Sequence, residues 1–150
     1  MELLKKKKVI CYLLRKNNND SEILVFDHRD YPDAGTQVVG GTVEDGENLL
    51  ATMVREIYEE AGIRIKLEDL KKIGNTEYLR KDRHEVNERT YFLLENQSHL
   101  PDYWEHIVKS DGEDNGMVFC FYWISVKRAK SILTGNFAEL IDKVSSESSG

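Results

Sequence analysis

Residues 41–63 read GTVEDGENLLATMVREIYEEAGI and form the most informative segment of the sequence. From Glu47 to Ala61 the apolar residues recur at spacings of three and four, which is the pattern of an amphipathic α-helix with one buried side. The apolar stripe consists of Leu50, Met53, Val54, Ile57 and Ala61. Gly62 follows the last apolar position, where a glycine commonly ends a helix. The stretch therefore predicts a glycine-rich loop that leads into a helix over 47–61.

The same helix carries three carboxylates beside its buried stripe, at Glu56, Glu59 and Glu60. At 100° per residue, the three side chains project on one side of the helix. Like charges three or four residues apart oppose helix formation, and anions in the last turn also face the negative end of the helix dipole. Two carboxylates about 6 Å apart repel by roughly 3 kcal/mol at an effective dielectric constant near 20, a cost that a divalent cation between them reverses. Oxygen ligands of this kind suit Mg²⁺, Mn²⁺ or Ca²⁺.

Acidity alone favours a solvated helix face over a metal site, so the residues around the carboxylates decide the interpretation. Gly40 and Gly41 open a loop that runs to Glu47. Glycines allow the backbone to approach a ligand or a metal ion closely, so a carbonyl or an amide of this loop can join a site at the helix. Arg55 lies at the edge of the acidic face, where its guanidinium can hold one carboxylate in a fixed rotamer.

Taken together, these residues resemble the Nudix box. The matching positions, at the family's fixed spacing, are Gly41, Glu47, Arg55, Glu56, Ile57, Glu59, Glu60, Gly62 and Ile63. The resemblance implies the family's α/β (α+β) sandwich with a central mixed β-sheet. It also implies hydrolysis of a diphosphate linkage in a nucleoside diphosphate derivative, by attack of water at phosphorus and with Mg²⁺ or Mn²⁺ bound. Val39 departs from the pattern, because many members carry a proline before the two glycines.

The resemblance assigns roles by position in the motif. The implied metal ligands are Glu56, Glu59, Glu60 and the backbone of Gly40 or Gly41. The implied catalytic residues are Glu56, Arg55, which would orient a glutamate, and Glu47, which would support the start of the helix. A carboxylate must also accept the proton of the attacking water. Glu56 is the first candidate for this base, and the alternatives in the long polar loop are Glu105, Glu113 and Asp114.

Three residues are candidates for contacts with the substrate. Arg29 ends a predicted strand at a point where its side chain can reach a phosphate, although an ordinary surface arginine would look the same. Gly41 lies in the loop before the helix. Tyr78 has a ring that can stack on a nucleobase, with packing in the core as the alternative.

Short runs rich in β-branched and aliphatic residues predict strands over 8–15, 22–28, 35–39, 72–80, 88–95 and 117–126. An amphipathic pattern predicts a closing helix over 136–144, and a long polar loop covers 96–115. This order of elements is typical of a mixed sheet covered by helices. We expect a single domain over 1–144, and a disordered tail over 145–150.

The composition narrows the class of protein. The chain has 150 residues and a formal net charge of −6, which argues against non-specific binding of nucleic acid. Its first apolar run, Val9 to Leu14, is too short to cross a membrane or to direct export, so we expect a cytoplasmic protein. The expected partner is a small nucleotide or nucleoside diphosphate derivative, and the expected state is a monomer or a homodimer.

Three functions fit the residues to different degrees. The first is a hydrolase that cleaves a nucleoside triphosphate, with dinucleoside polyphosphates and RNA 5′ ends as alternative substrates. The second is a Nudix-fold sensor that binds a nucleotide without cleaving it. The third is a structural protein that docks through an acidic helix. The intact set of Glu56, Glu59 and Glu60 favours the hydrolase, because a sensor has no need of a hydrolytic metal site.

Overall fold

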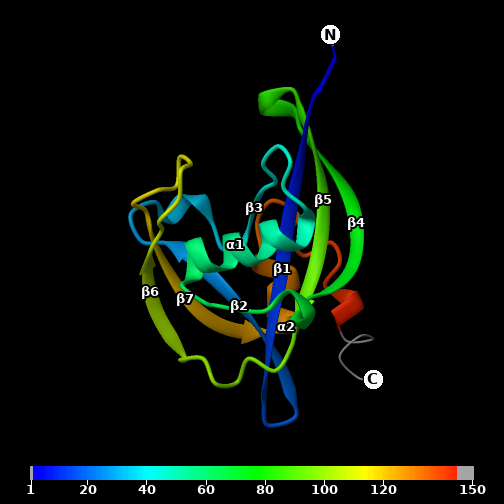
Figure 1. The fold of residues 1–150 in the computed structure, drawn as a ribbon. Helices are drawn as coiled ribbons and strands as arrows, with labels where there is room; N and C mark the ends of the chain where they lie inside the picture. Colours follow the sequence, from blue (N-terminus) through cyan, green and yellow to red (C-terminus); the bar gives the residue numbers. More distant parts are fainter. Residues whose placement is uncertain (1, 145–150) are drawn as a thin grey trace.

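A computed structural model describes residues 2–144 of the chain (Figure 1). In chain order, its elements are β1 (Leu4–Asn17), β2 (Asp20–His28), η1 (Pro32–Ala34), β3 (Gly40–Thr42), α1 (Leu49–Ala61), η2 (Leu67–Asp69), β4 (Lys71–Arg80), η3 (Lys81–Arg83), β5 (Glu85–Leu94), β6 (Tyr103–Ile107), β7 (Val118–Ser125) and α2 (Val126–Ile132). Among these residues, no helix is both long enough and apolar enough to cross a membrane.

The strands form one mixed sheet in the order β4-β5-β1-β2-β7-β6, and β3 pairs with β1 off this path. The pairing of β1 with β5 is parallel, with Val9 opposite Thr90, and the other pairings are antiparallel. The first part of β1 pairs with β5 and its last residues pair with β2, so this long strand joins the two halves of the sheet.

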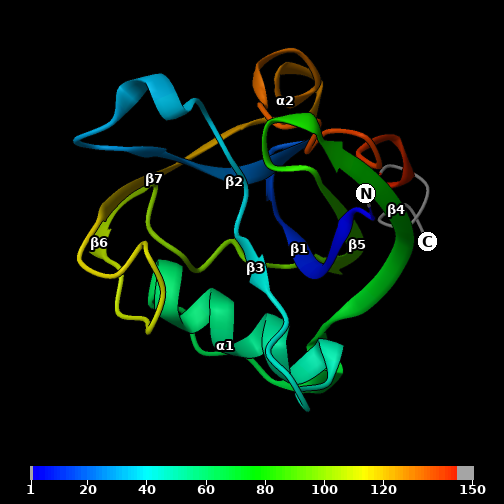
Figure 2. The same ribbon diagram turned by 90° about the horizontal axis from the view of Figure 1, so that it is seen from above.

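Alternate residues of β1 face two hydrophobic cores. Val9, Cys11 and Leu13 pack toward α1 with Met53 and Ile57, while the residues between them pack on the other side of the sheet, toward α2 and the last residues of the described chain. Figure 2 shows α1 and α2 on opposite sides of the sheet. The predicted fold class, a mixed sheet covered by helices, is confirmed.

Five of the six predicted strands coincide with β1, β2, β4, β5 and β7. The prediction of a strand over 35–39 is wrong, because this range forms only isolated bridges, from Gln37 to Phe26 and from Thr36 to Leu133, and the strand lies at Gly40–Thr42. Gly40 approaches β1 closely. A Cβ atom on Gly40 would lie 2.6 Å from the carbonyl oxygen of Val9, so only a glycine pairs here without strain.

The predicted loop over 96–115 contains strand β6, which the sequence did not indicate. β6 is a short edge strand whose alternate residues, Tyr103 and Ile107 among them, are exposed. Its inner positions carry Trp104 and His106 rather than aliphatic side chains. The usual alternation of apolar and polar residues is therefore absent, because a strand at the edge of a sheet buries little surface.

The predicted helix over 136–144 is wrong over most of its length, since residues 135–141 form successive turns and only 142–144 are helical. Asn136 has a φ of +61°, in the left-handed region. Two side chains also take carbonyl groups that a helix would need: Tyr12 donates to Phe137 O, and Arg89 donates to Gly135 O. The predicted disordered tail, 145–150, lies outside the described residues.

Candidate active site

Helix α1 forms much as its sequence pattern predicts. The side chain of Asn48 caps its start by accepting a hydrogen bond from Ala51 N at 2.7 Å, and Gly62 ends it with a φ of +76°. The predicted stripe is confirmed at Met53, Ile57 and Ala61, which are buried. Leu50 is exposed instead, while the carboxylates Glu56 and Glu60 lie on the buried side. The helix therefore buries two ionisable groups against the core.

Gly41 and Glu56 meet at the contact between β3 and α1. A Cβ atom on Gly41 would lie 2.1 Å from the carboxyl carbon of Glu56 and 2.4 Å from each of its oxygens. The absence of a side chain at residue 41 therefore makes room for this carboxylate. The neighbouring amide, Gly40 N, donates a hydrogen bond of 2.9 Å to Glu60 Oε1. The two glycines thus position two of the three helix carboxylates.

Arg55 holds the carboxylates in a fixed arrangement. Its guanidinium donates to both oxygens of Glu47, at 2.7 and 2.9 Å. Its Nη1 atom donates to Glu56 Oε1 and to Glu59 Oε2, each at 3.0 Å. A last bond, of 3.2 Å, reaches Thr42 O in the glycine loop. The paired contact with Glu47 joins the loop to the middle of the helix, while the catalytic role of Arg55 stays a prediction.

Glu56 and Glu60 are held in surroundings that disfavour their charged forms. Burial raises the pKa of Glu56 to about 7, and the charges of Glu59 and Asp114 act in the same direction while Arg55 opposes them. Burial also raises the pKa of Glu60 well above its usual value, and the charge of Glu56 adds to this effect. Such groups are poised to bind a cation or a proton.

Glu47 shows the opposite behaviour. Its hydrogen bonds with Arg55 lower its pKa to about 2, so this carboxylate stays ionised. The backbone amide of Glu44 donates to the same side chain at 3.1 Å. Glu47 therefore serves to fix the loop and Arg55 rather than to exchange protons.

The helix, the glycine loop and a polar loop at 110–114 enclose a cavity of about 400 Å³, which we call the box-side cavity. Its lining includes Gly40, Gly41, Arg55, Glu56, Glu59, Lys6, Lys8, Arg83 and residues 110–114. Two of the alternative bases, Glu113 and Asp114, lie on this lining. Ser110 Oγ donates to Asp114 Oδ1 at 2.6 Å and thereby holds the second of these carboxylates.

Two predicted residues lie elsewhere. Glu105 is on β6, where Arg29 Nη1 approaches it at 3.6 Å, and neither side chain lines the box-side cavity. Arg29 is exposed and also pairs with its neighbour Asp30. The geometry therefore gives Glu105 and Arg29 no place beside the helix carboxylates.

A divalent cation fits the chemistry of this site. Glu56, Glu59 and Glu60 supply carboxylate oxygens, and Gly41 leaves the space into which the Glu56 carboxylate fits. In residues 2–144, no three His, Cys, Asp or Glu side chains are grouped in the geometry of a metal site. Arg55 lies between Glu56 and Glu59 and neutralises both. The assignment of metal ligands therefore stays a prediction, and binding requires the carboxylates to turn away from Arg55.

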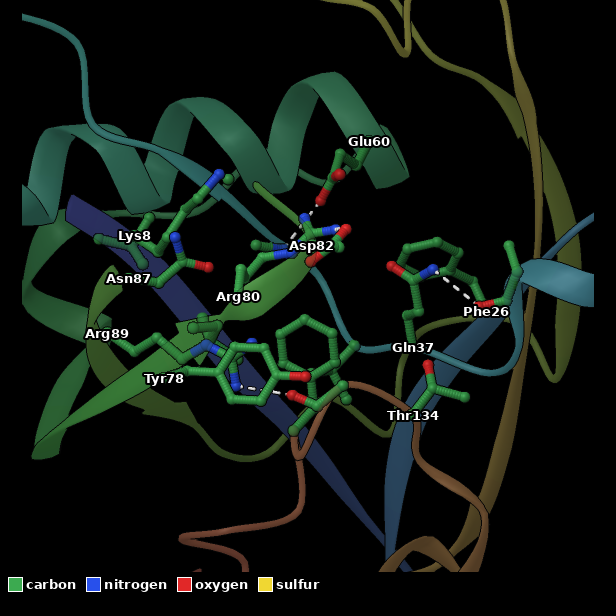
Figure 3. A pocket seen from close by; sticks show the side chains of 18 residues that line it. Lys8, Phe26, Gln37, Glu60, Tyr78, Arg80, Asp82, Asn87, Arg89 and Thr134 are labelled. Atoms are coloured by element: carbon green, nitrogen blue, oxygen red, sulfur yellow. Dashed lines mark hydrogen bonds and ion pairs between the residues drawn. The ribbon is translucent and has the colours of Figure 1, made fainter. Parts of the chain in front are cut away.

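A second cavity, of about 460 Å³, lies against β1, β4 and β5, and we call it the sheet-side cavity. Glu60, Gly40, Gly41 and Tyr78 line it, together with residues that the sequence had not pointed to: Lys8, Gln37, Arg80, Asn87, Arg89 and Thr134. Figure 3 shows Lys8, Arg80, Asn87 and Arg89 on one side of the cavity, with Gln37 and Thr134 on the other. Glu85, Asn87 and Arg89 alternate at the start of β5 and are all buried, but their burial is visible only in the structure, so the sequence did not indicate them.

Tyr78 reaches the sheet-side cavity, as predicted for a substrate contact, but its ring already has a partner. The guanidinium carbon of Arg89 lies 4.0 Å from the centre of this ring and 4.5 Å from that of Phe137. Arg89 is buried and also pairs with Glu139 at 3.2 Å. A cation therefore occupies one face of each ring.

The last turn of α1 is tied to β6. Trp104 Nε1 donates to Ala61 O at 3.1 Å, and a ring nitrogen of His106 lies 3.1 Å from Glu59 O. These bonds satisfy two of the carbonyl groups that a helix end leaves unpaired. They also fix the turn of the helix that carries Glu59 and Glu60.

Comparison with known proteins places this geometry in a family. The family model described as the NUDIX domain matches residues 4–144. The chain is 35% identical over 103 residues to diphosphoinositol polyphosphate phosphohydrolase 3-beta of Bos taurus, a match that covers 69% of this chain and 58% of that relative. It is 36% identical over the same length to the 3-alpha protein of Homo sapiens, with the same coverage. The chain thus spans less than two thirds of these relatives.

Solved structures show the same fold. An Ap4A hydrolase of C. elegans, in a binary complex, superposes with a TM-score of 0.66 at 23% identity, covering 97% of this chain and 98% of that one. A MutT protein from Methanosarcina mazei Go1 superposes with a TM-score of 0.69 at 15% identity, covering 100% of this chain and 99% of that one. With the carboxylate helix and the match of the family model, these comparisons establish that the chain belongs to the NUDIX domain family.

Proposed function

We propose that this protein is a divalent-cation-dependent pyrophosphohydrolase, which cleaves a diphosphate linkage by attack of water at phosphorus. The observation that carries the proposal is the placement of the Glu56 carboxylate over Gly41, with Arg55 holding Glu47, Glu56 and Glu59. A helix with only a structural role would gain nothing from burying two carboxylates of raised pKa.

The cation and the protein would contribute different parts of the hydrolysis. Bound Mg²⁺ or Mn²⁺ would neutralise phosphate charge and lower the pKa of a bound water. Glu59, Glu60, Glu56 and the Gly40 or Gly41 carbonyl would hold the ion. Arg55 and Glu47 hold the carboxylates near the glycine loop, and Glu56 and Glu59 would turn from Arg55 toward the ion when it binds.

Glu56 is our first candidate for the general base. Arg55 donates to its Oε1 atom, and the pKa of this carboxyl is about 7, so it can accept a proton near neutral pH. In the proposed step, the oxygen of water bonds to phosphorus, the bond to the bridging oxygen breaks, and the proton goes to the carboxylate. Asp114 is the alternative base, because it lines the same cavity.

Two groups of substrates are consistent with the proposed reaction. Nucleoside triphosphates are the default for a nucleotide hydrolase of this family. The curated relatives named above are diphosphoinositol polyphosphate phosphohydrolases, which favours a substrate with several phosphates. Because the chain spans only 58% of those relatives, their activity enters here as a proposal.

The test is a substrate panel with purified protein and Mg²⁺ or Mn²⁺. The panel contains nucleoside triphosphates, dinucleoside polyphosphates, ADP-ribose, a diphosphoinositol polyphosphate and 5′-triphosphorylated RNA, and released phosphate and pyrophosphate are measured. We expect one metal-dependent hit well above the rest. Glu60→Gln should lower kcat at least tenfold while the fold survives, because the amide oxygen can still accept the bond from Gly40 N.

The matched control is Asp45→Asn, an exposed carboxylate of the same loop that lines neither cavity, and this variant should keep most of the activity. Retention of more than about a tenth of kcat by Glu60→Gln would contradict the proposed role of this residue. Tight binding of a nucleotide without product over hours, with both cations, would favour the sensor instead.

A further inference from the structure

Strand β6 lies at one end of the sheet, and within residues 2–144 its only neighbouring strand is β7 (Figure 1). Just after β6, Val108 N donates to Met117 O at 2.8 Å, on the side of the chain that faces β7. Because alternate residues of a strand direct their backbone groups to the same edge, the even-numbered residues of β6 also bond toward β7. The backbone groups that point outward belong to Tyr103, Glu105 and Ile107.

The two ends of the sheet differ in how far their outer edges are covered. At the β4 end, Lys143 Nζ donates to Ile73 O at 3.0 Å, so the last part of the described chain occupies a carbonyl group of that strand. At the β6 end, the side chains of Tyr103 and Ile107 are 55% and 59% exposed. An exposed strand edge of this kind can pair with another extended chain.

A cavity of about 480 Å³ lies beside β6, and we call it the edge cavity. Trp104 and His106 line it from β6, Tyr58 lines it from α1, and Leu100 and Pro101 line it from the loop before β6. A strand added to β6 would direct alternate side chains to the side of the sheet on which Trp104 and His106 lie. Those side chains would meet the edge cavity, whose aromatic and aliphatic walls suit apolar groups.

The chain around the outer edge of β6 is acidic. Residues 102–114 contain five carboxylates and one lysine, in a chain whose net charge is −6. Glu105 lies at the centre of the outward-facing positions, where it accepts a hydrogen bond of 3.2 Å from the Tyr103 hydroxyl. Arg29 approaches its other oxygen at 3.6 Å but also pairs with Asp30. A basic residue opposite Glu105 would therefore form a favourable cross-strand pair.

The same charges argue against a second copy of this chain as the occupant. Antiparallel pairing of two copies of β6 along their full length would place Glu105 of one copy opposite Glu105 of the other. Like charges that lie directly opposite each other destabilise a strand pair. The acidic residues at 102–114 would also face their counterparts. The charge around β6 therefore favours a different partner, which is basic.

We propose that β6 is a docking site for an extended basic segment of a partner protein, which adds an antiparallel strand to the sheet. Alternate side chains of this segment are apolar and enter the edge cavity. On the other side of the sheet, a lysine or arginine of the segment lies opposite Glu105. The inference goes beyond the proposed function, because it concerns a protein partner rather than the substrate.

The test uses the end-blocked peptide Lys-Val-Leu-Lys-Leu-Val-Lys as the probe, with binding to the full chain measured by isothermal titration calorimetry. Its central lysine is designed to lie opposite Glu105, and its two leucines to face the edge cavity. We expect Glu105→Lys to weaken binding tenfold or more, and to gain affinity for the acidic counterpart Glu-Val-Leu-Glu-Leu-Val-Glu. Full affinity of Glu105→Lys for the basic peptide would overturn the proposal.

Glu77→Lys is the matched control. It reverses the charge of an exposed glutamate on β4, the strand at the other end of the same sheet. Its affinity for the basic peptide should stay within twofold of that of the unsubstituted protein. Equal losses in Glu77→Lys and Glu105→Lys would overturn docking at β6, because they would indicate general attraction between an acidic protein and a basic peptide.

Two methylated peptides test the backbone pairing without any change to the protein, so this part holds even if Glu105→Lys does not fold. In the antiparallel pairing, N-methylation of the central lysine removes an N–H group that faces β6, whereas N-methylation of the leucine before it removes one that points away. We expect the first change to weaken binding tenfold or more, and the second less than threefold. Equal effects, or a larger effect at the leucine, would overturn the proposed pairing.

Sedimentation equilibrium of the protein alone tests the other occupant. We expect no dimer that depends on β6. A dimer that the charged substitution Ile107→Asp dissociates would assign the outer edge of β6 to a second copy of this chain, and would overturn the proposal.

Discussion

The box-side cavity owes most of its chemistry to one continuous stretch of chain, whereas the sheet-side cavity combines side chains from β1, β4, β5 and the turns after α2. Both cavities carry charges of both signs. Lys6, Lys8 and Arg83 line the first beside the helix carboxylates, and Glu60 and Asp82 line the second beside its cations. Gly40 and Gly41 border both, so the two cavities meet at the glycine loop. The following predictions test this division.

The largest effect is expected from Gly41→Ala. The new Cβ atom would lie 2.1 Å from the Glu56 carboxyl carbon, so this carboxylate must leave its place. We expect a loss of kcat of about 100-fold or more, and a stability loss of about 1–3 kcal/mol. Steady-state kinetics and urea unfolding measure the two.

Gly46→Ala is the control for this variant. Gly46 also lies in the loop, with a φ of +80°, but a Cβ atom there would meet nothing within 4 Å. It should lose about 1 kcal/mol of stability through backbone strain and keep its activity. Equal kinetic losses in both variants would mean that loop strain, rather than the contact with Glu56, is responsible.

The second prediction concerns pH in the absence of divalent cations. The pKa of Glu56 is raised from 4.5 to about 7, chiefly by burial, so the folded state binds this proton more tightly than the unfolded state. Its stabilising contribution is complete below pH 4.5 and is lost as the pH rises to about 7, with a size on the order of 3 kcal/mol. We therefore expect Tm to fall over this range, and Mg²⁺ to raise Tm more at pH 8 than at pH 5.

Glu47 gives the opposite dependence. Arg55 lowers its pKa to about 2, so its contribution is present above pH 4.5 and is lost as the pH falls toward 2. In Glu56→Gln, the decrease of Tm between pH 4.5 and 7 should become smaller. The loss of stability below pH 4.5, which we assign to Glu47, should remain. An unchanged decrease would assign the effect to other groups.

The third prediction is that Arg55→Lys lowers kcat by about 10–100-fold. A lysine cannot contact Glu47 through two nitrogen atoms and also reach Glu56 and Glu59. The control is Arg64→Lys, because Arg64 stacks on Tyr58 of the same helix and takes no part in the carboxylate network. Wild-type kinetics in Arg55→Lys would show that the positive charge alone suffices.

The smallest effect is expected from Trp104→Phe. It removes the hydrogen bond to Ala61 O and should cost about 1 kcal/mol, with a few-fold loss of kcat because the last turn of α1 loosens. Trp123→Phe removes a similar bond, to Pro101 O at 2.9 Å, which ends on the loop before β6 rather than on α1. It should cost similar stability and leave kcat unchanged. Equal losses of kcat in Trp104→Phe and Trp123→Phe would show that the hydrogen bond from β6 to α1 does not affect catalysis.

Most of the fold could be predicted from the sequence because α1 and five strands carry complete local patterns. The carboxylate network was predictable for the same reason, since Glu47, Arg55, Glu56 and Glu59 are separated by at most twelve residues. The elements that were missed depend on distant partners. β6 exists because it pairs with β7, and the turns over 135–141 form because Tyr12 and Arg89 take their carbonyl groups.

The candidate site shows the same limit. Lys8, Arg80 and Asn87 become neighbours only when β1, β4 and β5 pair, so no local spacing announces them. Arg29 and Glu105 have residue types that suit a site, but Arg29 follows the end of β2 and Glu105 is on the edge strand β6, where the two approach each other away from the helix carboxylates. Residue type and spacing along the chain therefore predict a site well only where one element carries it.

The parallel pairing of β1 with β5 has a consequence for folding kinetics. Val9 and Thr90 are register partners although most of the described chain separates them, so this pairing must close a long loop before it gains hydrogen bonds. The loop and helix over 41–63 need no such closure. We therefore expect the loop and helix over 41–63 to acquire structure early in refolding. The pairing of β1 with β5, which builds the sheet-side cavity, should form only in the last, slow step.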